Sequence, residues 1–361
     1  MPPRLLDFRS DTATRPTPAM REAIARAEVG DDVANEDPTT NRLQERLAAM
    51  LGKEAALYVP SGTMSNQIGI RIHCQPGDEF ICETQCHVYN YEQGAFAQLS
   101  GLVARTVEGE FGVLKLDQIR DLIRPNDPHN VRTRLVSLEN THNRGGGRVQ
   151  PYDEVERLCT WAHEQGLATH LDGARLFNAV VATGIPAIEW AKHFDTVSVC
   201  FSKGLGAPVG SALAGPRDLI AKALRVRKLF GGAMRQAGVI AAAALYALDH
   251  HIDRLAEDHA NAQLLAEGIR SIPGLDLWPP KIDTNLVIFR VAAELGAAAD
   301  FAARLKARGL LTIPFGGRTI RAVTHLDVSR ADTEEAVGIL REVASEGPTG
   351  FTAKPVEGAY R

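Results

Sequence analysis

The chain has little cysteine, few aromatic residues and no long apolar run, and each shortage excludes something. Its five cysteines are an odd, small number, which argues against a disulfide framework and fits a reducing cytoplasm. No stretch approaches the roughly 20 apolar residues of a membrane-spanning helix, so we expect no membrane association. The first residues, Met-Pro-Pro-Arg-Leu-Leu-Asp, lack the apolar centre of a secretion signal, which also favours the cytoplasm.

An excess of charge of one sign is missing too. The 361 residues include 40 Lys and Arg against 44 Asp and Glu, a formal net charge of -4. Without a basic run or a basic stripe with interleaved aromatic residues, we expect no nucleic-acid partner. The hydrophobic share of 45% is that of an ordinary globular protein, and the length favours two domains.

One group of residues invites a metal site. His73, Cys74, Cys82, Cys86 and His87 lie close in sequence, but their spacing matches no common zinc pattern. We interpret the cysteines as small apolar core residues and predict no metal ligands. Whether a structural cation binds elsewhere is not decided by the sequence.

The pattern between residues 18 and 250 alternates strands with helices. Short strands are predicted over 55–59, 79–82, 102–107, 134–138, 167–171 and 196–201, with helices between them such as 152–163. Such alternation predicts an α/β fold with a mostly parallel sheet covered by helices. In these sheets ligands bind beyond the carboxyl ends of the strands.

The later part of the chain has a different character. Long helices are predicted over 216–230 and 237–265, with His250 and His251 on a solvated face. A strand over 284–290, two short strands around 316–317 and a helix over 333–345 then predict a smaller α+β domain. We therefore expect a large domain over 1–250, a small C-terminal domain over 251–345 and a mobile tail over 346–361.

The most informative motif is Ser202-Lys203, which ends an apolar strand and precedes glycine-rich turns. Lysine is seldom fully buried, so Lys203 is a candidate for forming a Schiff base with a carbonyl group. Asp172 ends an earlier strand, and Arg175 follows it closely. A lysine, an aspartate and an arginine in these places favour a site for pyridoxal 5'-phosphate (PLP). The simpler alternatives are a solvated loop lysine, a turn aspartate and a surface arginine.

Other candidate groups also follow predicted strands. Ser61-Gly62-Thr63 precedes a helix, whose N-terminal amides would suit a phosphate, although serine and threonine are common helix caps anyway. His87 and His142 lie in loops, where a histidine is either a catalytic base or an ordinary polar group. Arg321 stands in an apolar strand and favours an anionic partner.

Together these segments resemble the L-threonine aldolases, a family of PLP enzymes with the aspartate-aminotransferase-like fold. The resemblance covers nearly all of residues 7–330, and its strength is that many short stretches occur in one order. These stretches are 7–12, 30–32, 36–38, 60–63, 139–143, 172–175, 202–206, 234–236 and 321–328.

The resemblance implies roles in holding the cofactor. Lys203 would form the Schiff base, Asp172 would face the pyridine nitrogen, and His87 would stack on the ring. Gly62 and Thr63 would contact the phosphate.

The resemblance also implies contacts to substrate and between subunits. Ser10, Arg175 and Arg321 would hold the substrate carboxylate, and Arg175 is also placed to reach the cofactor phenolate. Lys228 and Arg235 would reach the phosphate from a neighbouring subunit. The family implies a homotetramer built from catalytic dimers.

The implied reaction is the cleavage of L-threonine, L-allo-threonine and related β-hydroxy-α-amino acids to glycine and an aldehyde. His87 and His142 are both candidates for the base, and the sequence does not choose. Ala34 replaces a tyrosine usual in the family, which leaves the preferred side chain and the threo or allo selectivity open.

Three other interpretations compete. The nearest is a different PLP reaction on the same fold, either β-elimination or racemisation. A non-catalytic PLP-binding protein is disfavoured because Lys203, Asp172, Arg175 and Arg321 occur together. A dinucleotide-binding protein is disfavoured because the glycine pattern after Lys203 is incomplete.

Overall fold

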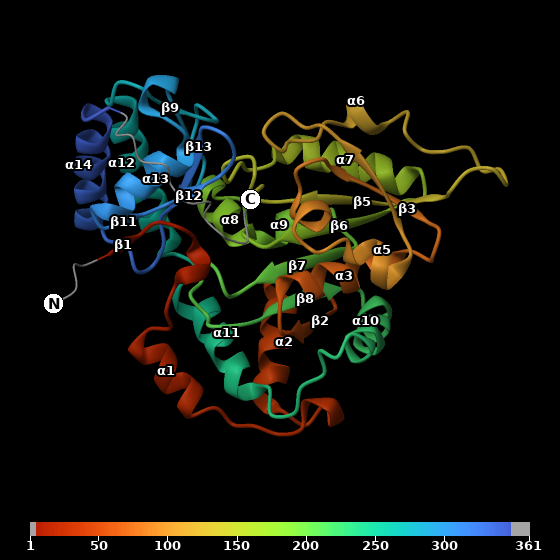
Figure 1. Ribbon diagram of the computed structural model, residues 1–361. Helices are drawn as coiled ribbons and strands as arrows, with labels where there is room; N and C mark the ends of the chain where they lie inside the picture. Colours follow the sequence, from red (N-terminus) through yellow and green to blue (C-terminus); the bar gives the residue numbers. More distant parts are fainter. Residues whose placement is uncertain (1–4, 348–361) are drawn as a thin grey trace.

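The computed structural model describes residues 5–347, in which two main β-sheets have separate apolar cores (Figure 1). The larger sheet has seven strands in the order β2-β8-β7-β6-β5-β3-β4. They are β2 (Ala55–Val59), β3 (Glu79–Glu83), β4 (Val103–Val107), β5 (Thr133–Glu139), β6 (Ala168–Gly173), β7 (Thr196–Cys200) and β8 (Ser211–Gly215).

The larger sheet is mostly parallel, as predicted. Strands β3 to β7 pair in parallel, and β8 runs antiparallel to both of its neighbours. The six predicted strands are present with ends that differ by at most two residues. The strand β8 was not predicted because Ser-Ala-Leu-Ala-Gly has no β-branched or aromatic residue to indicate it. This strand forms because it is buried and paired between β2 and β7.

Helices cover both faces of this sheet. On one face lie α3 (Gly62–His73), α4 (His87–Asn90), α5 (Ala95–Ser100) and α10 (Arg217–Leu229). The other face is covered by α2 (Pro38–Leu51), α6 (Leu116–Ile119), α7 (Tyr152–Glu164), α8 (Leu176–Thr183) and α9 (Ala187–Ala191). Helices α1 (Pro18–Ala25) and α11 (Gly238–His250) pack beside α2. Side chains point alternately to the two faces along each strand. In β6, Leu171 packs in the apolar core on the face that α7 covers, which we call the α7 core, and His170 lies against α3 on the other face.

The smaller sheet is antiparallel and has the order β12-β13-β10-β9. Its strands are β9 (Leu275–Leu277), β10 (Leu286–Val291), β12 (Ile313–Pro314) and β13 (Thr319–Val323), and it packs with α12 (Leu255–Arg270), α13 (Ala298–Ala307) and α14 (Arg330–Ser345). The α/β class with a smaller α+β part is therefore confirmed.

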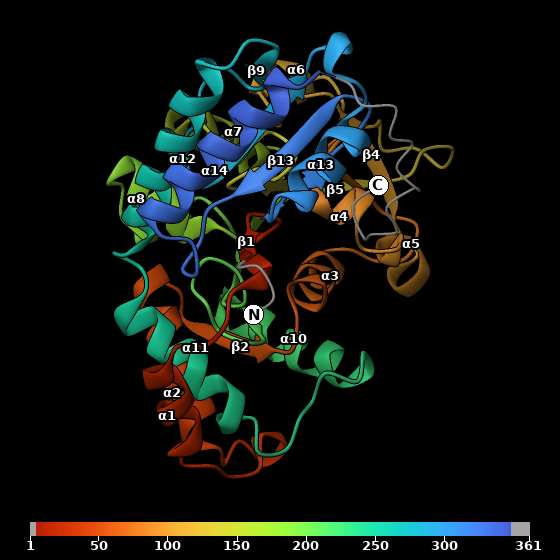
Figure 2. The same ribbon diagram turned by 60° about the vertical axis from the view of Figure 1, so that its left-hand side comes forward.

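The N-terminal segment joins the smaller body. Strand β1 (Leu6–Asp7) pairs in parallel with β11 (Leu310–Leu311), and Phe8 is buried in the smaller core. Figure 2 shows this segment beside the helices of the smaller body. The chain then passes through η1 (Asp11–Ala13) toward the large sheet, where the Thr14 hydroxyl donates to the Lys203 carbonyl at 3.2 Å. Residues before 250 thus contribute to both cores, and the domain limits remain a prediction. Two further short turns are η2 (Asp32–Ala34) and η3 (Ala293–Leu295).

The single helix predicted over 237–265 is wrong. The chain turns between α11 and α12, and His251, which we expected on a solvated face, is only 5% exposed. Its Nδ1 lies 2.7 Å from the carbonyl oxygen of Leu205, just after Lys203. Both helices have similar composition, and the break occurs where the chain leaves one core for the other.

Two further predictions concern the ends and the membrane. The predicted tail lies, from residue 348 onward, outside the described residues. Within residues 5–347, no helix combines the length and the apolar character needed to cross a bilayer.

Candidate active site

The carboxyl ends of the central strands bring the predicted residues together. Glu139, Asp172 and Ser198 are register partners on β5, β6 and β7, so these strand ends form one edge. Lys203 follows β7 by three residues and is half-buried. Within residues 5–347 its ammonium makes no hydrogen bond or ion pair, although its charge acts on Asp11 and His87. The structure therefore leaves this amine available for a ligand at the strand edge.

Asp172 is held at the end of β6 by an amide that the sequence analysis missed. Its Oδ2 accepts a hydrogen bond from Asn66 Nδ2 at 2.8 Å, and its Oδ1 accepts one from the Ala174 amide at 3.1 Å. The carboxylate is only 3% exposed. Each carboxylate oxygen has two acceptor positions, so Asp172 retains capacity for one more donor, such as a protonated ring nitrogen.

His87 begins α4, and a buried acid fixes its ring. Its Nδ1 lies 2.9 Å from Glu92 Oε1, while Asn66 and Gln67 donate to the same carboxylate at 2.9 and 2.5 Å. Burial alone would lower the pKa of His87, but the hydrogen bond to Glu92 and the charges of Asp172 and Glu92 outweigh it and raise the pKa. The Nδ1 contact leaves Nε2 as the basic nitrogen.

Glu139 organises the loops around the site. One carboxylate oxygen accepts from the His87 backbone amide at 2.7 Å and the other from the Asn143 amide at 2.8 Å. It therefore ties the end of β5 both to the start of α4 and to the loop that carries His142.

His142 is completely buried, and each ring nitrogen lies close to a polar group. Its Nδ1 accepts a hydrogen bond from the Gly145 amide at 3.0 Å, and its Nε2 lies 2.9 Å from a Glu83 carboxylate oxygen. Burial opposes protonation, but Glu139 and Glu83 raise the pKa of this imidazole. Since the unprotonated nitrogen already faces an N–H group, His142 has no free position from which to accept a substrate proton.

Arg175 lies at the site, but its guanidinium grips a residue of the N-terminal segment. Its Nε and Nη2 bind the two carboxylate oxygens of Asp11, each at 2.7 Å, and Asn285 donates to Asp11 at 3.2 Å. Burial would raise the pKa of Asp11, but Arg175 and Lys203 hold it well below its usual range. The predicted contact of Arg175 with substrate or phenolate therefore competes with this ion pair. Asp11 lies in the stretch 7–12 that carries the family resemblance, but its ion pair with Arg175 was not predicted.

Arg321 and Ser10 come from the smaller sheet and the N-terminal segment. Arg321 is 1% exposed, and it donates to Asn143 Oδ1 at 2.9 Å and to the Arg9 carbonyl at 3.2 Å. The Ser10 hydroxyl oxygen caps η1 by accepting from the Thr12 amide at 3.2 Å. Both predicted carboxylate ligands thus lie where the N-terminal segment passes between the two cores.

The start of α3 has the features of an anion site. Ser61 caps the helix by accepting from the Met64 amide at 3.2 Å, which leaves the first-turn amides of Gly62 and Thr63 directed outward. A Cβ at Gly62 would lie 3.5 Å from Ser211 Oγ, a buried hydroxyl without a hydrogen-bond partner among the described residues. These first-turn amides and the Ser211 hydroxyl are hydrogen-bonding groups without a partner among the described residues, and they suit the phosphate of PLP. With the Lys203 amine and the Asp172 carboxylate, the donor set fits this cofactor.

Three predicted residues do not lie at this edge. Ala34, Lys228 and Arg235 are exposed on another surface of the same chain. That surface is held together by a buried ion pair, in which Arg227 Nη2 lies 2.9 Å from Asp32 Oδ2, and by Arg235 Nη1, which lies 2.7 Å from Asp31. Ala34 therefore does not face the reacting bond from within its own chain.

Among the residues considered for zinc, Cys82 and Cys86 are buried in one apolar cluster beside α3, and Cys74 packs against it. Within the described part of the chain, the residues near enough to share an ion are His87, Glu92 and Asp172, whose ligand atoms lie within 4.8 Å of one another. Asn66 already bridges the two carboxylates. Asn66 and Glu92 are the part of the site that sequence reasoning missed, because they belong to no recognisable motif.

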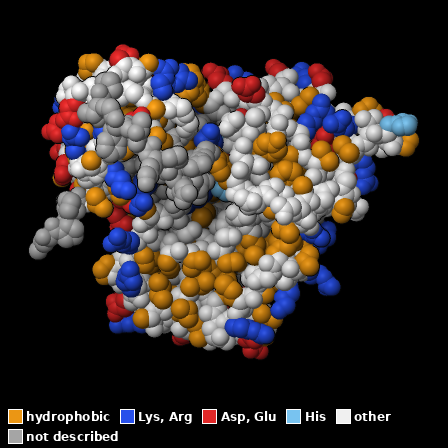
Figure 3. Space-filling model, in the orientation of Figure 1, with side chains coloured by type: hydrophobic (Ala, Val, Ile, Leu, Met, Phe, Trp, Pro, Cys, Tyr) orange, Lys and Arg blue, Asp and Glu red, His pale blue; other side chains and the backbone are white. Residues whose placement is uncertain are grey.

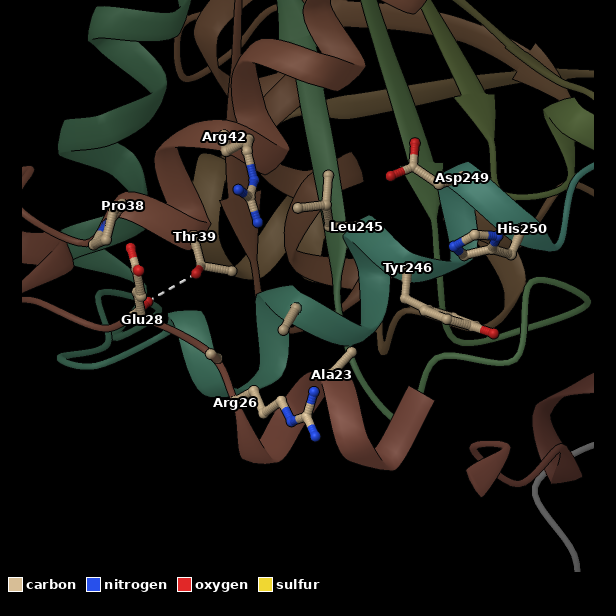
Figure 4. A pocket seen from close by; sticks show the side chains of 12 residues that line it. Ala23, Arg26, Glu28, Pro38, Thr39, Arg42, Leu245, Tyr246, Asp249 and His250 are labelled. Carbon is tan, nitrogen blue, oxygen red and sulfur yellow. Dashed lines mark hydrogen bonds between the residues drawn. The ribbon is translucent and has the colours of Figure 1, made fainter. Parts of the chain in front are cut away.

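A separate hollow lies between α1, α2 and α11 (Figure 4). It measures about 360 Å³, and its wall includes Arg26, Arg42, Tyr246 and Asp249. Thr39 closes one side by donating to the Glu28 carbonyl at 2.7 Å. None of the residues predicted for catalysis lines it, so this hollow is distinct from the strand-end site.

Comparison with known proteins agrees with this geometry. The model of the β-eliminating lyase family matches residues 7–293. The low specificity L-threonine aldolase of Escherichia coli K12 is 45% identical over 332 residues, covering 92% of this chain and 97% of its own. Low-specificity L-threonine aldolase 1 of Arabidopsis thaliana is 42% identical over 346 residues, covering 94% and 96%. A solved Leishmania major threonine aldolase has the same fold, with a TM-score of 0.80, 21% identity and coverage of 95% and 100%.

Proposed function

The chain belongs to the β-eliminating lyase family, and from this premise we propose that it is a PLP-dependent L-threonine aldolase. It cleaves L-threonine, L-allo-threonine and related β-hydroxy-α-amino acids to glycine and an aldehyde. The observation that carries this proposal is the meeting of Lys203, Asp172 and His87 at one sheet edge, in a chain 45% identical to such an aldolase over 92% of its length. When bound, PLP supplies an electron-withdrawing ring that weakens the bond between Cα and Cβ.

The cofactor is held from three directions in this proposal. Lys203 supplies the amine that binds its aldehyde, and Asp172 keeps its ring nitrogen protonated because a buried carboxylate favours a cationic partner. The amides of Gly62 and Thr63, with the unpartnered Ser211 hydroxyl near Gly62, would hold the phosphate. His87 would lie against the ring.

The substrate carboxylate is held by Arg321, with Ser10 and Arg175 beside it. Arg321 is fixed by Asn143 and by the Arg9 carbonyl, so it presents its charge without reorganising. Arg175 acts mainly by holding Asp11, which ties the N-terminal segment across the site. A carboxylate held in this way would fix the orientation of the substrate's Cα in the site.

His87 is the histidine better placed to accept the proton of the β-hydroxyl group, directly or through water. Glu92 contacts Nδ1 of His87, whose side chain is 22% exposed. The side chain of His142 is 1% exposed, its Nδ1 accepts from Gly145, and its Nε2 faces Glu83. If His87→Asn keeps a near-native cleavage rate with cofactor bound, neither histidine is the base. A loss of about 10²-fold or more would support His87.

We further propose a homotetramer built from catalytic dimers. Figure 3 shows hydrophobic side chains gathered over the part of the surface where α1 and α11 lie in Figure 1. Leu229 is 66% exposed on α10, one residue from Lys228, and Val239 is 43% exposed at the start of α11, near Arg235. An apolar surface that also carries cations would place Lys228 and Arg235 at a neighbour's phosphate. Analytical ultracentrifugation of wild type and Leu229→Asp tests this, and an unchanged mass would contradict it.

The deciding experiment follows products from the purified, PLP-loaded protein. L-threonine, L-allo-threonine and L-phenylserine should each give glycine and an aldehyde in equal amounts, whereas β-elimination from L-serine or L-threonine would give a keto acid and ammonia, and racemisation the D-amino acid. Lys203→Ala should abolish turnover, and Lys306→Ala, an exposed lysine on α13, is the matched control. Aldehyde release that survives Lys203→Ala would refute the assignment.

We also propose a cytoplasmic location. All five cysteines are unpaired in the structure, and four of them are buried, as in proteins of reducing compartments. A cell fractionation with activity in the membrane or secreted fraction would contradict this.

A further inference from the structure

A row of polar groups, buried except for the half-buried His73, connects the far end of α3 with Asp172. His73 Nε2 lies 2.9 Å from Thr196 Oγ1, which lies 2.9 Å from His170 Nδ1. His170 Nε2 lies 3.4 Å from Asn66 Oδ1, and Asn66 Nδ2 donates to Asp172 Oδ2 at 2.8 Å. His170 and Thr196 are 0% exposed, so the whole row lies between the helix and the sheet.

The secondary structure aligns these groups. Asn66, Gly69 and His73 lie on one face of α3, because residues three, four or seven apart share a face. His170 and Asp172 are two residues apart on β6, so their side chains point to the same side of the sheet. Thr196 is the register partner of His170 on β7.

Gly69 makes room for the central imidazole. A Cβ at this position would lie 2.4 Å from His170 Cε1, closer than any real contact. Only glycine lets the ring of His170 fit between α3 and β6. The close packing of α3 against His170 therefore depends on glycine at position 69.

The partners dictate the direction of every hydrogen bond. Ionised carboxylates only accept, so Asn66 must turn its nitrogen toward Asp172 and Glu92 and its oxygen toward His170. His170 Nε2 then carries the proton, and Nδ1 of the neutral ring accepts from the Thr196 hydroxyl. The oxygen of Thr196 in turn accepts from His73 Nε2–H. All dipoles point toward the two carboxylates.

Burial lowers the pKa of both histidines, which favours their neutral forms. For His170 it lowers the pKa to about 3, although Asp172 opposes this. Burial and Lys222 lower the pKa of His73 to about 4, although Asp195 opposes this. We therefore expect the direction of the row to be the same from pH 5.5 to 8.5.

We propose that Asn66 is a positioning residue that holds the carboxylates of Asp172 and Glu92 side by side, and that the row His73–Thr196–His170 fixes the orientation of its amide. Each of the two N–H groups of Asn66 binds one carboxylate, which offsets their mutual repulsion. Hydrogen bonds aligned in a row polarise one another and strengthen the last donor. The inference rests on the proposed role of Asp172 toward the ring nitrogen of PLP.

The first test needs no variant and no cofactor. ¹⁵N NMR of the imidazoles in the cofactor-free protein should show His170 as a neutral ring with its proton on Nε2, unchanged from pH 5.5 to 8.5. A protonated Nδ1, or a cationic ring in this range, would overturn the row.

The second test compares Thr196→Val with Thr196→Ser, two changes remote from the reacting groups. Valine matches the shape of threonine but cannot donate to His170, whereas serine can. Loss of one buried hydrogen bond predicts a cofactor dissociation constant about threefold to tenfold higher for valine, and within about twofold of wild type for serine. The pH at which the absorption of bound cofactor changes should also shift in the valine variant only. Melting temperatures check that both variants fold.

The outcomes separate the two proposals. A wild-type protein that binds no PLP refutes the proposed function and with it the role of Asn66 at the cofactor. Tight wild-type binding that Thr196→Val leaves unchanged refutes the row while the proposed function stands. If the valine variant does not fold, the NMR result on the wild-type protein decides.

Discussion

The pair of His87 and Glu92 permits a quantitative prediction from one substitution, Glu92→Gln. Glutamine keeps the size of the side chain but removes the negative charge that lies 2.9 Å from His87 Nδ1. The pKa of His87 is raised in the folded protein because Glu92 and Asp172 outweigh the effect of burial. The substitution should therefore lower it.

The magnitude follows from the strength of the contact. A hydrogen bond to a charged group contributes about 1.5–3 kcal/mol, and one pKa unit corresponds to about 1.4 kcal/mol. We expect the pKa of His87 to fall by about one to two units. A raised pKa stabilises the fold fully below the unfolded value of about 6.5, and this contribution is lost as the pH rises through the folded value. The stability lost in Glu92→Gln should thus be larger at pH 5.5 than at pH 9.

The assay is an NMR titration of the His87 Cε1 proton in cofactor-free protein, with urea unfolding at both pH values. Glu83→Gln is the matched control, because Glu83 contacts His142 and not His87. It should leave the His87 titration in place. An unchanged pKa of His87 in Glu92→Gln, within about 0.3 units, would refute the reasoning, since the nearest charge would then not control the ring.

Three further predictions concern stability. Asp11→Ala removes the anion from a buried pair with Arg175 and should lower the free energy of unfolding in urea by about 3–5 kcal/mol. As the control, Asp249→Ala breaks the half-exposed pair with Arg46 and should lower it by less than about 1 kcal/mol. Equal losses would contradict the argument. Because the pKa of Asp11 is lowered, its contribution is complete above its unfolded value of about 3.9 and fades as the pH falls below it, so the stability difference between wild type and Asp11→Asn should shrink below pH 4. Leu158→Ala in the α7 core, where the side chain is 0% exposed, should cost about 2–5 kcal/mol, and a loss below about 1 kcal/mol would show that the site collapses around the change.

The central strands were predictable because apolar runs and turns repeat with a strand and helix period. Lys203 and Asp172 stood out for the same reason, since each ends such a run and parallel strands end at a common edge. The break between α11 and α12 was not predictable, because Ala-rich and Leu-rich sequence continues through it and only the position of two separate cores requires the turn.

Residues whose roles come from distant partners were also beyond the sequence. Arg175 was expected at the substrate, but its guanidinium binds Asp11, 164 positions away. Local sequence shows the type of this side chain but not which group it meets.

By itself the sequence determined the α/β class, the order of the central strands along the chain and the identity of the amine and acid at their ends. Periodicity and turn residues act locally, so these features can be read without coordinates. Tertiary structure alone decided that Asn66, Glu92 and His170 surround Asp172, and that His142 is enclosed. Hydrogen-bond partners, burial and therefore pKa depend on distances between segments far apart in the chain, which no local pattern encodes.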